Sequence, residues 1–91
     1  MIYFRHMNTK ILTYRTIIEK DGKYYHGYVP SLPGCHTQGD TIEETRKNLK
    51  EAIIGILLVM KKYKQPIPTD ESLETIETID TAKIFGKAHY A

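Results

Sequence analysis

The stretch that decides the fold runs from Tyr28 to Glu44 and reads YVPSLPGCHTQGDTIEE. Its first half ends a tyrosine-rich segment with two prolines and a glycine, and neither proline can donate to a strand ladder. Its second half fits a capping box, in which the Thr41 hydroxyl accepts a hydrogen bond from the Glu44 amide and the Glu44 side chain reaches back. The stretch therefore predicts a strand, a tight corner and the start of a long helix.

Upstream of this stretch, two runs rich in β-favouring residues predict a hairpin. Ile11 to Glu19 and Tyr24 to Val29 are separated by Lys-Asp-Gly-Lys, residues 20–23. Asp-Gly is typical of a two-residue hairpin turn, because both central residues take φ > 0 there. A short third strand is expected at residues 35–38, after the corner, and the three runs together predict an antiparallel sheet.

Downstream, the spacing of apolar residues predicts a helix that closes at the lysines before Pro66. Residues at three- and four-residue spacing form a stripe that should lie on the sheet: Ile42, Thr45, Leu49, Ala52, Ile53, Ile56, Leu57 and Met60. Ile54, Leu58 and Val59 lie off this stripe, so either the C-terminal tail or another subunit should cover them. Alternation from Leu73 to Ile79 predicts a fourth strand at a sheet edge.

Composition indicates one small domain of ordinary globular type, with 91 residues, 41% apolar and 26% charged. The net charge of +2 is too small to indicate a class of partner, but residues 71–80 carry four carboxylates and no base. The single cysteine, Cys35, cannot form an internal disulfide. The longest apolar run, residues 53–60, is too short for a membrane span, and the opening residues do not read as a signal peptide. We therefore expect a cytoplasmic protein.

Candidate catalytic groups are few. Cys35 could act as a thiol with His26 or His36 as its base, but neighbouring strand residues point to opposite faces and free cysteines usually pack in cores. A metal-dependent nuclease would need clustered carboxylates, whereas Glu19 stands at a strand end and the helix acids have a capping role. The sequence thus predicts no catalytic residue, no metal site and no cofactor.

A nucleic-acid interpretation rests on aromatic residues with basic neighbours, namely Tyr14, Tyr24, Tyr25 and Tyr28 with Arg15, Lys20 and Lys23. Tyrosine is also a common strand residue, and the structural interpretation is favoured. Lys61, Lys62 and Lys64 suit the negative end of a helix better than a phosphate contact. The acidic residues 71–80 fit equally a solvated edge strand and a surface that opposes a basic partner.

The middle of the chain resembles the HicB family, the antitoxin half of HicA–HicB toxin–antitoxin pairs. The resemblance covers residues 11 to about 70 and includes the stretch 28–44, an Asn-x-Lys-Glu-Ala-Ile run in the helix and Pro-Ile-Pro at residues 66–68. Its motif positions are Tyr28, Pro30, Leu32, Pro33, Gly34, Cys35, Gly39, Asp40, Thr41 and Glu44. It implies an α+β, partial ribonuclease-H-like fold of order β-β-β-α-β, with a three-stranded antiparallel sheet, one helix packed across it and a short fourth strand.

The resemblance also implies a function: a non-enzymatic antitoxin that binds and masks a HicA-like toxin, a small basic protein that cleaves mRNA. HicB antitoxins commonly carry a C-terminal DNA-binding module, for which residues 72–91 are too few, so we do not expect this chain alone to bind a promoter. We expect a single domain over residues 1–91, with its core at 11–80 and a tail at 81–91, that forms a homo-oligomer, a dimer or a tetramer. The alternative is a solitary HicB-like domain without a toxin, acting in RNA binding or as a structural oligomer.

Two groups of residues are candidate contacts for the toxin or for a second subunit. One is the apolar set on the helix, and the other is the predicted acidic strand; together they comprise Ile54, Leu58, Val59, Leu73, Glu74, Glu77 and Asp80.

Overall fold

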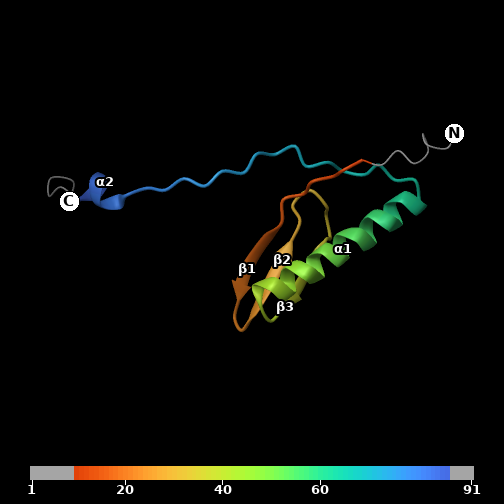
Figure 1. Ribbon diagram of the computed structural model, residues 1–91, viewed down its shortest axis with the longest axis horizontal. Helices are drawn as coiled ribbons and strands as arrows, with labels where there is room; N and C mark the ends of the chain where they lie inside the picture. Colours follow the sequence, from red (N-terminus) through yellow and green to blue (C-terminus); the bar gives the residue numbers. More distant parts are fainter. Residues whose placement is uncertain (1–9, 87–91) are drawn as a thin grey trace.

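A computed structural model describes residues 10–86 (Figure 1). Its elements, in chain order, are β1 (Ile17–Asp21), β2 (Tyr24–Tyr28), β3 (His36–Gly39), α1 (Ile42–Lys62) and α2 (Thr81–Phe85). The strands pair antiparallel in the order β1-β2-β3, and α1 packs across one face of the sheet. The predicted α+β class, with a three-stranded antiparallel sheet and one long helix, is confirmed.

The β1–β2 hairpin forms as predicted, although its turn lies one residue later. Ile17 pairs with Tyr28 and Asp21 with Tyr24, so the two central residues are Gly22 and Lys23. Gly22 alone of these two has a positive φ, 63°, which fits a turn with glycine in the first central position rather than one with two positive φ values. The first strand is also shorter than expected, because residues 11–16 precede the paired region.

The loop after β2 supplies most of the fully buried core residues. The Leu32 amide donates to the Val29 carbonyl, the Cys35 amide donates to the Leu32 carbonyl, both at 3.0 Å, and Gly34 has φ 82°. Leu32 is 0% exposed and Cys35 2%, and both pack with Val29 and Leu49. The prolines therefore fix a tight loop whose apolar residues form the centre of the core.

The predicted cap at the start of α1 forms, with Glu44 reaching back to the residue before the N-cap Thr41. The Thr41 hydroxyl accepts from the Glu44 amide at 3.0 Å, while the Glu44 carboxylate accepts from the amide of Asp40 at 2.7 Å. The helix then runs to Lys62, and the Tyr63 amide donates to the Val59 carbonyl. One position of the predicted apolar stripe is wrong: Ile42 is 50% exposed, because it precedes the turn at which the helix meets the sheet.

Two glycines let α1 lie close to the sheet. A Cβ at Gly39 would stand 2.6 Å from the Thr45 hydroxyl oxygen and 2.7 Å from the Thr45 amide nitrogen. A Cβ at Gly27 would stand 3.0 Å from the Thr45 methyl group and 3.2 Å from a Leu49 methyl group. Thr45 and Leu49 are accordingly the buried residues of the helix. The contact between helix and sheet thus depends on the absence of side chains at these two strand positions.

The predicted fourth strand, Leu73 to Ile79, does not form. Residues 65–80 have no regular structure; they return past the start of β1 and then run away from the sheet (Figure 1). Every side chain from residue 71 to 80 is exposed, and the protein is 71 Å long in its longest dimension. A strand needs a neighbour for its amides and carbonyls, and along its described course this segment meets no sheet edge. We call residues 71–80 the acidic arm.

The short helix α2 after the acidic arm had no counterpart in the sequence prediction. The Asp80 carboxylate caps it by accepting from the Ala82 amide at 3.0 Å. Residues 87–91 of the expected tail lie outside the described residues. Within residues 10–86, no helix has the length and apolar character needed to cross a membrane.

We predict that Gly39→Ala destabilises the protein by roughly 1–3 kcal/mol, because the added methyl group would overlap the first turn of α1. Chemical denaturation followed by circular dichroism measures this change. The control is Lys47→Ala, at an exposed position of α1 where helix propensity favours alanine. Equal stability of the two variants would show that the close approach at Gly39 carries no cost.

Candidate functional site

The single cysteine lies in the core rather than in a reactive position. Cys35 is a free thiol, 2% exposed, and burial raises its pKa. A nucleophilic thiol needs the opposite shift, because the thiolate is the reactive form. Among the described residues, no group of three or more His, Cys, Asp or Glu side chains is placed to hold a metal ion.

The motif residues line the corner and the helix start. Leu32 and Cys35 are core residues, Gly34 takes the left-handed turn conformation, and Thr41 and Glu44 cap the helix. Asp40 donates its amide to Glu44, and Gly39 permits the approach of Thr45. Each of these positions serves the fold, so the surfaces available for function lie elsewhere.

The face of the sheet away from α1 carries aromatic and histidine side chains, and within residues 10–86 no helix packs on it (Figure 1). Gly27 contacts the helix, so its strand neighbours His26 and Tyr28 point to the other face, and the pairing of Tyr28 with His36 places that histidine there as well. The ring of His26 lies 6.0 Å from that of Tyr28 and 5.7 Å from that of His36. By the same register, Glu19 belongs to this face.

The aromatic and basic residues of the nucleic-acid interpretation do not gather into one surface. The Tyr14 hydroxyl donates to the carbonyl of Pro68, and burial, with the nearby Asp70 carboxylate second, raises the pKa of Tyr14. Arg15 is engaged by Asp70. Tyr25, with the Lys20 ammonium 5.1 Å from its ring, lies on the helix side of the sheet, opposite to Tyr24 and Tyr28.

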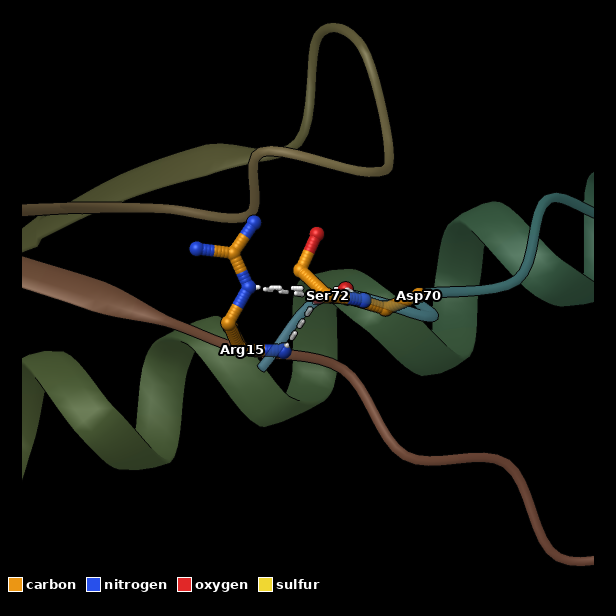
Figure 2. A network of polar contacts seen from close by, with 3 residues as sticks. All are labelled: Arg15, Asp70 and Ser72. Atoms are coloured by element: carbon orange, nitrogen blue, oxygen red, sulfur yellow. Dashed lines mark hydrogen bonds and ion pairs between the residues drawn. The ribbon is translucent and has the colours of Figure 1, made fainter. Parts of the chain in front are cut away.

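The acidic arm begins at a polar anchor that sequence analysis missed. The Asp70 carboxylate accepts from the Arg15 backbone amide at 2.9 Å, from Arg15 Nε at 3.1 Å and from the Ser72 amide at 3.0 Å (Figure 2). The Asp70 side chain is only 2% exposed. The amide of Arg15, followed by that of Ser72 and by the charge of Arg15, holds the pKa of Asp70 at about 2. The Asp-x-Ser spacing indicates a local turn, but nothing in the sequence indicates the contact with Arg15.

Beyond this anchor the acidic arm presents charge and apolar groups together. Glu74, Glu77 and Asp80 are exposed, and so are Leu73 and Ile76, at 87% and 90%. Among the described residues, the only ion pair is that between Arg15 and Asp70. The carboxylates of the acidic arm therefore form no ion pair within residues 10–86. An extended segment of this kind can lie along the surface of a basic protein.

The second candidate surface is on α1, on the side opposite the sheet. Ile54, Leu58 and Val59 are 50%, 64% and 53% exposed. Of the two coverings considered from sequence, the described part of the tail, residues 65–86, is not one, because these side chains remain open to solvent and the arm runs away from the sheet (Figure 1). The structure therefore separates the candidate residues into two surfaces, an apolar one on α1 and an acidic one on the arm.

Comparison with known proteins identifies relatives over most of the chain. Residues 14–84 match the family described as HicB-like antitoxin of bacterial toxin–antitoxin system. A UPF0150 protein of Thermoplasma acidophilum is 45% identical over 64 residues, covering 69% of this chain and 93% of the relative. A UPF0150 protein of Synechocystis is 41% identical over 64 residues, covering 68% and 80%. An uncharacterised 14.9 kDa protein of Haemophilus phage HP1, from the rep-hol intergenic region, is 30% identical over 90 residues, covering 85% and 68%. No solved structure matches significantly.

The lowered pKa of Asp70 predicts an acid-sensitive anchor. Its folded pKa of about 2 lies below the unfolded value of about 3.9, so the stabilisation is fully present above pH ~4 and is lost as the pH falls toward 2. An NMR titration of the Arg15 amide resonance should show this loss with a midpoint near pH 2. Asp70→Asn should abolish this titration of the Arg15 amide resonance. Glu71→Gln, an exposed control, should leave the titration unchanged. A wild-type midpoint near pH 4 would show that the carboxylate is not held by the anchor.

Proposed function

Because this chain belongs to the HicB-like antitoxins of bacterial toxin–antitoxin systems, we propose that it binds and masks a small, basic, HicA-like toxin that cleaves mRNA. The observation that carries the proposal is the extent of the family match, which runs from residue 14 to residue 84. The match includes the sheet, α1 and the whole acidic arm. The arm therefore lies within the matched region.

The acidic arm suits a basic partner better than any other described surface does. Its four carboxylates, Glu71, Glu74, Glu77 and Asp80, stand on ten consecutive exposed residues without a base. Complementary charge raises the association rate and selects the partner, and the apolar side chains between the acids supply area to bury. The anchor at Asp70 fixes where the arm leaves the sheet, so the carboxylates project from a defined point.

An antitoxin that masks a toxin acts by binding alone. Covering a toxin's active site requires a complementary surface and no chemistry, so we propose a non-enzymatic role. We place the protein in the cytoplasm, where mRNA is the toxin's substrate, and propose that it acts as a homo-oligomer. We also propose that the sheet and α1 correspond to the partial ribonuclease-H-like fold implied by the family resemblance.

The direct test first asks whether the reading frame beside this gene encodes a small basic protein, and then assays the RNA cleavage of that protein. Absence of such a protein from the neighbouring frames would count against the antitoxin role. Cleavage should fall as the chain is added and should cease near stoichiometric amounts. Persistent cleavage at a large molar excess of this chain would refute the antitoxin role.

A charge-reversal series tests the part played by the arm. We predict that Glu77→Lys weakens toxin binding roughly three- to tenfold, and that Glu74→Lys with Glu77→Lys weakens it further, because each change places a positive charge against a basic surface. Isothermal titration calorimetry at two salt concentrations measures both effects. The matched control is Glu19→Lys, an exposed glutamate on the sheet, which should bind as the wild type does. Equal losses of toxin affinity for the Glu77 and Glu19 variants would show that the toxin does not bind at the acidic arm.

A further inference from the structure

The outer side of α1 carries a row of exposed residues. The inner side meets the core through Thr45, Leu49 and the partly buried residues after them. On the outer side, six exposed positions at three- and four-residue spacing form what we call the helix ridge: Glu51, Ile54, Gly55, Leu58, Val59 and Lys62. On an isolated surface helix this side is polar, so three large apolar side chains here indicate a covered surface.

The ends of the helix ridge carry opposite charges. Glu51 stands at its N-terminal end and Lys62 at its C-terminal end, and the two lie at equal distances along the helix from its midpoint near Ile56 and Leu57. Neither makes an ion pair within residues 10–86. Gly55, near the middle, leaves open space, because a Cβ built there meets no atom within 4 Å. An open apolar groove of about 570 Å³ adjoins it, lined in part by Gly55 and Val59.

We propose that the helix ridge is an interface with a second copy of this chain, in which the two α1 helices pack antiparallel about a two-fold axis near Ile56 and Leu57. The axis brings Glu51 of each copy opposite Lys62 of the other. It brings Ile54 opposite Leu58, and it brings the open position at Gly55 opposite Val59. These pairs fall on matching sides of the two helices, because residues three, four and seven apart share one helix face.

The charge pattern selects this arrangement over the parallel one. Parallel helices in register would place Glu51 beside Glu51 and Lys62 beside Lys62, whereas the antiparallel pair makes two attractive contacts. The same pattern selects a second copy as the occupant, because the ridge is complementary to itself in shape and in charge. A two-fold interface of this kind closes after two chains and leaves both acidic arms outside it.

The test measures the association of this chain alone by sedimentation equilibrium. The wild type should be a dimer, or a larger assembly that Leu58→Lys divides into smaller ones, and Leu58→Lys should raise the dissociation constant by at least roughly a hundredfold. The matched control is Leu73→Lys on the arm, which should associate as the wild type does. Circular dichroism confirms that each variant is folded. A monomeric wild type, or association unchanged by Leu58→Lys, would overturn the proposal.

A mixing experiment tests the antiparallel arrangement itself. Glu51→Lys and Lys62→Glu should each raise the dissociation constant roughly tenfold, because each variant opposes like charges at both ends of the interface. An equimolar mixture of the two variants should recover wild-type affinity as a heterodimer, in which both contacts are attractive again. A mixture no tighter than its components would overturn the arrangement. The assay contains no toxin, so its outcome is separate from that of the antitoxin proposal.

Discussion

The structure depends on how closely the first half of α1 approaches the sheet. Gly27 and Gly39 present bare backbone beneath Thr45 and Leu49, and Thr45, fully buried, directs its hydroxyl to the Thr41 carbonyl at 2.7 Å. Because the helix is held at this end, its apolar inner side reaches the core formed around the corner loop. The second half of the helix extends from this fixed point with only partly buried side chains facing inward. The exposed outer side follows from the same geometry.

Local chemistry made the helix and the hairpin predictable from sequence, whereas contacts distant in sequence were not. The capping residues, Gly22 and the proline corner act on neighbouring backbone, so their spacing is sufficient to infer that a turn or a helix start occurs, although the hairpin turn lies one residue later than predicted. The alternation of residues 73–79 indicates only that this segment could pair, and pairing also needs an edge within reach. The anchor between Arg15 and Asp70 joins residues 55 positions apart, and neither residue carries a local signal of the other. Residues 54, 58 and 59 were identifiable because helix periodicity places them off the buried stripe.

Family membership and structure answer different parts of the functional question. The match to HicB-like antitoxins assigns the class, while the motif that supports the resemblance is occupied with the corner, the cap and the close approach of α1. The residues free to meet partners are those whose identity the fold does not require. They form two surfaces of different character, one charged and extended and one apolar and helical, which suits two partners of different chemistry. The proposed masking and the proposed self-association would therefore use separate surfaces of the same chain.

The position of the acidic arm outside the folded body has a consequence for how the protein could be switched off. Proteases cut extended, exposed backbone far more readily than packed elements. Residues 71–80 are all exposed, and the core residues Val29, Leu32, Cys35 and Leu49 precede them in the chain. A single cut after the Asp70 anchor would remove the four carboxylates and leave the sheet, α1 and the core in place. Loss of the proposed antitoxin action would then require no unfolding, and its rate would be set by the accessibility of ten residues rather than by the stability of the protein.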